Sequence, residues 1–396
     1  MNILFINCSF RLFDGIDCGA ANRSTMFVKS LSKIGHVDVL NFYKDPLKSN
    51  VPNCYVVYNC TTQPTIHRRI EYWSVHLRLL FSPWSPNAYY LPEKSCEEVV
   101  DKQLKQKKYD IIACRYINEA VMCGLQKYTD RLVIDVDDNL RSALLRDVKA
   151  IKFRHFYGKW LLLYRAHTIQ MMCENFLSKV KVSFYSNILE PASTKSIFLH
   201  NVTTTNTKCK DIIETTPMRL LFVGWLDFHP NKFGILHFVD NVYPRIKKVH
   251  PNVELHVVGK TKDEELKEHL NSIEGVKALG FVEDLSEEYE NCRVIILPVY
   301  HGAGTSVKFV EGLMMNRPMV STPMGSRGYE EKCHDGKEYL LANTDEEFAD
   351  KVNVLLSNTA LAREIATDAY KAGMENYSAE CFENIVVNNI KKVFND

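Results

Sequence analysis

The residues best suited to chemistry lie in one glycine-rich stretch, residues 301–325, which follows the apolar run 294–297. Gly302 and Gly304 permit a ligand to approach the backbone closely, and a helix is predicted directly after them, over 306–315. A glycine-rich turn that opens a helix offers free N–H groups and the positive end of the helix dipole. The spacing therefore predicts an anion site suited to a diphosphate.

Two charged residues of the predicted helix could complete this site. Lys308 lies in the first turn, where its ammonium could add positive charge beside the phosphates. Glu311 follows one turn later on the same side, where a carboxylate could accept two hydrogen bonds from a ribose diol. The alternative is a tight strand–helix turn with a surface Lys and a surface Glu, and the spacing alone does not decide between them.

The elements around this stretch follow one pattern along the whole chain, in which short apolar runs alternate with amphipathic segments. The pattern predicts strands at 3–7, 37–40, 55–58, 111–114, 132–135 and 182–184, then at 219–223, 253–258, 276–279, 294–297, 319–321 and 339–341. Helices are predicted at 22–34, 233–250, 264–272, 285–291, 306–315 and 360–394. Strands that alternate with helices indicate parallel sheets. The polar stretch 203–217 separates the two series and is interpreted as a linker.

Composition narrows the class of protein. The 396 residues suggest two or three domains. Lys and Arg total 49 against 48 Asp and Glu, a balance that argues against a general nucleic-acid binder. The 12 cysteines form no Cys-x-x-Cys pair, so we expect free thiols and no structural metal. We find neither a secretory signal nor a run of about 18 apolar residues, so we expect a cytoplasmic chain.

The glycine-rich stretch resembles the nucleotide-sugar signature of retaining glycosyltransferases with the GT-B fold, of the family 4 or group 1 type. The matching positions are Gly302, Gly304, Thr305, Lys308, Glu311, Pro318, Val320, Ser321, Thr322 and Gly325. Other segments agree in order: Gly19–Arg23, Asp135–Asp138, Leu221–Gly224 with His229–Asn231, Gly259 and Gly280–Asp284. The resemblance is dense over 218–330 and thin before it.

The resemblance implies an α/β fold with two facing Rossmann-like domains and a C-terminal helix that crosses back to the first domain. The acceptor-binding domain would span 1–202, the linker 203–217 and the donor-binding domain 218–375. The crossing helix would span 376–396. The implied reaction moves a sugar from a nucleotide diphosphate sugar to an acceptor hydroxyl with retention, without metal or cofactor, in the synthesis of a surface polysaccharide or glycolipid.

The resemblance also implies roles for single residues. Glu311 would hold the ribose, while Lys308, Thr305 and the Gly304 backbone would hold the diphosphate. Nearer the sugar would lie Gly302, Ala303 and, from the other domain, Gly19. The remaining donor-side positions are Gly224, Asn231 and Val282, the last beside the base or simply in the core. On the acceptor side, Arg115 and Tyr116 stand where some members have a histidine, which makes Arg115 a candidate catalytic residue.

Departures from the family pattern leave alternatives open. Ala303 replaces a frequent Glu, Ser306 a frequent Arg, and Trp225 an Arg that binds phosphate in many members. These changes motivate a catalytically degenerate scaffold that binds a nucleotide sugar. A sugar-nucleotide epimerase, which also has two Rossmann domains, is a further alternative. The Asp135–Asp137 pair could hold a metal, although a polar strand end is the simpler interpretation.

A basic and aromatic stretch lies in the presumed acceptor half. Residues 141–170 carry seven Lys and Arg against one acid, with aromatic side chains between them. A second such stretch is 67–90. A basic amphipathic helix can lie on an anionic membrane surface, although its aromatic side chains can equally pack into a core. We therefore expect a saccharide or lipid-linked acceptor, no nucleic acid, and a cytoplasmic protein that can bind the inner face of the membrane.

Overall fold

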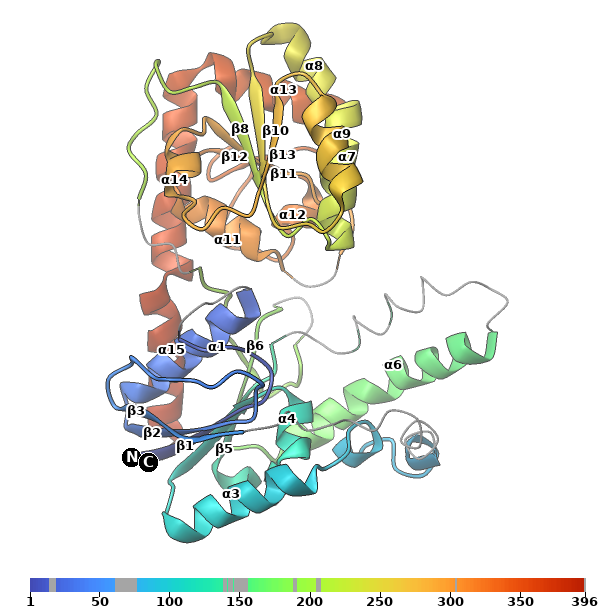
Figure 1. Cartoon of the computed structure of the whole chain (residues 1–396), viewed down its shortest axis with the longest axis vertical. Coiled ribbons are helices and arrows are strands. Elements are labelled where there is room, and N and C mark those ends of the chain that lie inside the picture. Colours follow the sequence, from blue (N-terminus) through green and yellow to red (C-terminus); the bar gives the residue numbers. More distant parts are fainter. Residues whose placement is uncertain are drawn as a thin grey trace. The chain divides into compact units, whose positions relative to one another are not determined.

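The structure, a computed structural model, describes residues 1–13, 19–60, 77–137, 141, 145, 156–187, 191–203, 208–302 and 305–394. The chain forms two compact units, one of Met1–Val202 with Ala379–Asp396 and the other of Thr203–Ser378. In each unit a parallel sheet is flanked by helices (Figure 1). The predicted fold class, two Rossmann-like α/β units, is confirmed.

The first unit is built on a seven-stranded sheet of order β3-β2-β1-β4-β5-β6-β7. Its strands are β1 (Asn2–Asn7), β2 (His36–Asn41), β3 (Cys54–Asn59), β4 (Ile111–Arg115), β5 (Leu132–Asp135), β6 (Val182–Tyr185) and β7 (Ile197–Phe198). All neighbouring strands are parallel. Most of these strands are buried, which explains their apolar runs. The two-residue β7 is too short to show a period and was not predicted.

The described helices of the first unit include one from the far end of the chain. They are α1 (Gly19–Ser32), α3 (Lys94–Gln106), α4 (Ile117–Met122), α6 (Phe156–Leu177) and α15 (Ala379–Phe394). Figure 1 shows α15 beside α1, and Phe382, Val386 and Ile390 of α15 share a buried cluster with Phe27 of α1. The predicted C-terminal helix that returns to the first unit is confirmed, and it begins at Ala379.

The second unit has a six-stranded parallel sheet of order β10-β9-β8-β11-β12-β13. Its strands are β8 (Arg219–Val223), β9 (Glu254–Val258), β10 (Val276–Gly280), β11 (Val294–Leu297), β12 (Met319–Ser321) and β13 (Leu340–Leu341). Its helices are α7 (His229–Asn241), α8 (Tyr243–Val249), α9 (Glu264–Ser272), α10 (Ser286–Glu290), α11 (Val307–Met314), α12 (Pro323–Ser326), α13 (Asp345–Ser357) and α14 (Thr359–Tyr377).

Two long predicted helices are each divided in the structure, and these two predictions were wrong in length. The segment 233–250 becomes α7 and α8 because Pro244, in the first turn of α8, lacks the N–H that a continuous helix requires. The segment 360–394 becomes α14 and α15, which are separated at Ser378, a residue with extended backbone.

Much of the stretch 203–217 is held against the second unit by buried side chains. One Arg293 nitrogen, Nη2, donates to the carbonyls of Ile213, Glu214 and Thr216 at 3.0, 2.9 and 2.6 Å. Arg317 donates to the Lys210 carbonyl at 2.7 Å. Residues 208–217 are therefore part of the packed surface of this unit.

Among the described residues, all cysteines are free thiols. Within these ranges, no helix combines the length and the apolar character that crossing a membrane requires.

Candidate donor and acceptor sites

The glycine-rich stretch opens α11, as predicted. Ser306 is the N-cap residue and makes no side-chain capping bond, so its hydroxyl does not occupy the first N–H groups of the helix. The start of the helix is fixed from behind, because Phe309 stacks on Tyr329 at 4.7 Å and the Tyr329 hydroxyl donates to the Ser306 carbonyl at 2.9 Å. Two predicted site residues, Ala303 and Gly304, lie outside the described residues.

Lys308 and Glu311 lie half-buried on α11, and Lys308 reaches the turn after β8. A Cβ atom added to Gly224 would lie 2.5 Å from Cε of Lys308 and 3.1 Å from Nδ2 of Asn231. The structure thus brings together Gly224, Asn231 and Lys308, three predicted donor-site residues from three separate segments. A larger residue at 224 would displace the end of the lysine side chain from this position.

The charges of this pair are poorly solvated. Burial lowers the pKa of Lys308, against the attraction of Glu311, and burial raises the pKa of Glu311, against the attraction of Lys308. No described residue forms a hydrogen bond or ion pair with either charged group. Desolvated and unpaired charges cost free energy, and a ligand with phosphate and hydroxyl groups would compensate for that cost.

Hydrogen bonds hold the turn between β8 and α7. Asn231 is buried, and its Nδ2 donates to the Trp225 carbonyl at 2.7 Å. At the N-terminus of α7, the His229 ring lies 3.0 Å from the Nε2 atom of His301, which ties the start of the glycine-rich stretch to this helix. No described atom outside the chain neighbours lies within 4 Å of the position of a Cβ atom on Gly302, next to His301. A ligand group could therefore approach Gly302.

Val282 lies after β10 and packs with Leu285 against the buried cluster that contains Tyr289 and Val310. Glu311 lies near this region. Burial raises the pKa of Tyr289, and the negative charge of Glu311 raises it further. Phe281 beside Val282 is 72% exposed. Val282 thus lines the edge of the core near Glu311, which fits both interpretations made from the sequence.

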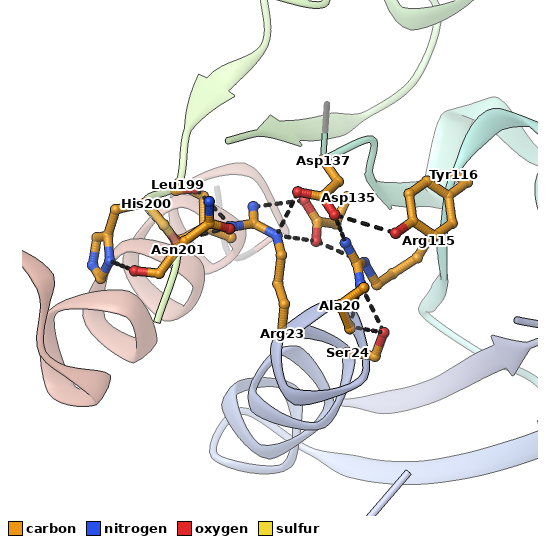
Figure 2. Close-up of polar contacts among 10 residues, drawn as sticks. All are labelled: Ala20, Arg23, Ser24, Arg115, Tyr116, Asp135, Asp137, Leu199, His200 and Asn201. Carbon is orange, nitrogen blue, oxygen red and sulfur yellow. Dashed lines mark hydrogen bonds and ion pairs between the residues drawn. The ribbon is translucent and has the colours of Figure 1, made fainter. Parts of the chain in front are cut away.

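The acceptor-side candidate Arg115 ends β4 and is fully buried (Figure 2). Its Nη1 donates to the Ala20 carbonyl at 2.6 Å and to Ser24 Oγ at 2.8 Å. Its Nη2 donates to Asp137, and its Nε lies 3.0 Å from Asp135. Gly19, the other candidate of this unit, begins α1 one residue before Ala20.

A second buried arginine, Arg23 of α1, belongs to the same cluster. It contacts Asp135 through two bonds of 2.8 Å and donates to the carbonyls of Leu199 and His200 at 2.9 Å (Figure 2). The sequence did not reveal this pairing, since Arg23 and Asp135 are 112 positions apart and follow no common motif. Both aspartates are paired with arginine, and the described residues contain no cluster of three or more side chains that could hold a metal.

Comparison with known proteins agrees with this geometry. Residues 217–358 match the family model described as glycosyl transferases group 1. An uncharacterised 44.6 kDa protein in the cps region of Klebsiella pneumoniae is 24% identical over 382 residues, 92% of this chain and 94% of that protein.

Solved structures show the same fold across the whole chain. Sucrose-phosphate synthase from Thermosynechococcus elongatus has a TM-score of 0.67 at 14% identity, covering 100% of this chain and 99% of its own. HepE from Anabaena in complex with UDP-glucose has a TM-score of 0.63 at 14% identity, covering 99% of this chain and 100% of its own. WaaG, a glycosyltransferase involved in lipopolysaccharide biosynthesis, has 0.60 at 14% identity, covering 99% of both chains.

The resemblance seen in the sequence is therefore confirmed for the fold and for residues 217–358. The chain has the GT-B fold, and its second unit matches the group 1 glycosyltransferases.

Proposed function

We propose that this protein is a retaining glycosyltransferase that moves a sugar from a nucleotide diphosphate sugar to an acceptor hydroxyl. The observation that carries the proposal is the half-buried pair of Lys308 and Glu311 on α11, whose charged groups no described residue binds and whose lysine reaches the turn at Gly224. HepE, whose fold is similar, was solved in complex with UDP-glucose.

Each donor-site residue has a part in this proposal. The α11 N-terminus, Thr305 and Lys308 bind the diphosphate, and Glu311 accepts hydrogen bonds from the ribose hydroxyls. Gly302 leaves space for the sugar. Gly224 and Asn231 hold Lys308 in place, and Val282 packs beside the base.

The chemistry follows from charge. Negative charge grows on the leaving phosphate as the sugar–oxygen bond breaks, so Lys308 and the helix N-terminus stabilise the transition state more than the bound donor. The departing phosphate oxygen takes the proton of the acceptor hydroxyl on the same face of the sugar, which retains the anomeric configuration. In this scheme the protein supplies the positive charge itself, and we propose that a divalent metal is not required.

We also propose an acceptor that belongs to a surface polysaccharide or glycolipid, with the reaction at the cytoplasmic face of a membrane. The Klebsiella relative is described as a protein in the cps region, and WaaG as involved in lipopolysaccharide biosynthesis. Of the basic stretch 141–170, the structure describes residues 141, 145 and 156–170, where Trp160 and Leu163 of α6 are 48% and 44% exposed. These side chains and the flanking basic residues suit an anionic lipid surface.

A product analysis tests the reaction. The protein is incubated with EDTA, a panel of UDP- and GDP-sugars and n-octyl glycosides as acceptors, and products are identified by proton NMR. We expect a new glycoside with the anomeric configuration of the donor. A free isomerised nucleotide sugar would instead indicate an epimerase, whereas donor binding without turnover would indicate a scaffold.

A further inference from the structure

Four charges, three of them fully buried, balance one another at the carboxyl ends of β4 and β5. Arg23 and Arg115 face Asp135 and Asp137 (Figure 2). Arg115 is 1% exposed, and its guanidinium is occupied by Ala20, Ser24 and both aspartates. A side chain so enclosed cannot contact a substrate. Its effect must pass through the residues that it holds.

Two of the residues that Arg115 holds reach the surface of the first unit. Asp137 has a side chain that is 16% exposed, and Tyr116 is half-buried. The Tyr116 hydroxyl donates to Asp137 Oδ2 at 3.2 Å (Figure 2). The Arg115 guanidinium lies 4.6 Å from the centre of the Tyr116 ring. Arg115 thus fixes both partners of a hydroxyl–carboxylate pair.

Tyr116 and Asp137 both adopt a backbone conformation that residues other than glycine rarely adopt. Tyr116 has φ +61° and Asp137 has φ +64°, in the left-handed region that favours glycine. Residues in such conformations cluster at active sites and ligand-binding sites. Tyr116 is a bulky residue in this conformation, which points to a role for its side chain.

The charge states of the pair suit a sugar hydroxyl. Burial alone would raise the pKa of Asp137, but Arg115 and Arg23 lower it to about 2, so the carboxylate remains ionised and accepts hydrogen bonds. Burial raises the pKa of Tyr116, so its hydroxyl keeps the proton that it donates to Asp137. The hydroxyl of a ligand can therefore donate to the remaining lone pairs of the Asp137 carboxylate and of the Tyr116 oxygen.

We propose that Tyr116 and Asp137 bind a hydroxyl group of the saccharide acceptor, and that Arg115 is a positioning residue that holds both in place. This inference rests on the proposed glycosyl transfer. The pair lies at the carboxyl ends of two adjacent parallel strands, the edge at which open α/β sheets bind ligands.

The test separates acceptor binding from donor binding. Initial rates are measured for the wild type, Tyr116→Phe, Asp137→Asn and Arg115→Lys, using the pair of nucleotide sugar and n-octyl glycoside that the wild type turns over fastest. The asparagine variant keeps a residue that tolerates the left-handed backbone, so it removes mainly the charge. For Tyr116→Phe and Asp137→Asn we expect the acceptor KM to rise about tenfold or more, while the donor Kd changes less than twofold.

The same unit contains a matched control. The Tyr109 hydroxyl donates to the Asp38 carboxylate at 2.6 Å, and Tyr109 precedes β4 at the opposite edge of the sheet. Tyr109→Phe therefore removes the same type of bond away from the proposed site, and we expect its acceptor KM to match the wild type. Arg115→Met is measured beside Arg115→Lys. An acceptor KM for Arg115→Lys between those of Arg115→Met and the wild type would support a positioning role, whereas equal values for the two variants would contradict it.

The outcomes distinguish this inference from the proposed function. If the wild type binds and turns over the donor but Tyr116→Phe and Asp137→Asn keep the wild-type acceptor KM, the inference is overturned and the proposed function stands. An equal rise of KM in Tyr109→Phe would also overturn it, since the effect would then be a general loss of structure. If the wild type neither binds nor turns over any donor, the proposed function fails and the inference fails with it.

Discussion

At the scale of single residues, the donor site is marked by the charges of Lys308 and Glu311, which have no hydrogen-bond or ion-pair partner among the described residues. Both residues are half-buried, whereas the fully buried Arg23 and Arg115 form ion pairs with two aspartates. Unpaired and buried charge is expensive to maintain, so it marks a place where a ligand completes the structure. The paired cluster serves to position its neighbours.

The role of Lys308 can be measured by its effect on two kinetic constants. In Lys308→Met we expect kcat to fall by about 100-fold or more and the donor KM to change far less, because the lysine neutralises charge that develops in the transition state. Lys232→Met, which removes a cation of α7 that is paired with Asp263, is the control. A fall in kcat/KM caused entirely by KM would make Lys308 a simple binding group.

Gly224 offers a steric test of the same site. In Gly224→Ala the new methyl group would displace the end of the Lys308 side chain, which is flexible, so we expect Tm to change little and donor affinity to fall about tenfold. Isothermal titration and differential scanning calorimetry measure the two effects. Normal affinity in this variant would show that the position of Lys308 over Gly224 is not required.

At the scale of elements, a buried carboxylate links the end of β1 to α4. Glu119 is fully buried and accepts a hydrogen bond from Ser9, and burial raises its pKa to about 8. The folded state therefore holds a proton that the unfolded state releases above about pH 4.5, so stability falls as the pH rises from about 5 to 8.

Replacing this carboxylate removes the titration. In Glu119→Gln we expect a flatter dependence of Tm on pH than in the wild type over this range, because the amide does not ionise and its oxygen can still accept from Ser9. Glu268→Gln, at an exposed position of α9, should keep the wild-type slope. Parallel curves for Glu119→Gln and the wild type would contradict the raised pKa.

Much of the element order could be predicted from the sequence. The bounds of β8, β11, β12 and α9 agree with the prediction, because each is a clear apolar run or an amphipathic segment with a strong start signal. The donor-side motif was also visible, since its residues are close in sequence. The Arg23–Asp135 pairing and the left-handed Tyr116 were not, because long-range contacts and the fold around a strand end decide them.

At the scale of the whole molecule, the chain builds its first unit from both ends. Phe382 of α15 is fully buried in one cluster with Phe27 of α1. The Arg23 guanidinium lies 5.5 Å from the centre of the Phe382 ring. The core of the first unit is therefore complete only when the last helix has docked.

A substitution in α15 should thus affect the two units differently. In Phe382→Ala we expect the first unit to lose about 3–5 kcal/mol of stability, while the affinity of the second unit for nucleotide stays unchanged. Lys391→Ala, exposed on the same helix, is the control. Denaturant unfolding monitored with and without nucleotide measures both effects. Equal losses of stability and nucleotide affinity would show that the units do not respond separately.

The most direct test of the central claim is isothermal titration of the wild type and Glu311→Gln with UDP, GDP and their sugars in the presence of EDTA. We expect one nucleotide family to bind the wild type, and its affinity to fall about tenfold or more in the variant, since the ribose loses hydrogen bonds to a charged group. Tm should not fall, because the variant removes a desolvated carboxylate to which no described residue donates a hydrogen bond. Equal affinity in both proteins, or no binding to the wild type, would contradict the assignment of the donor site.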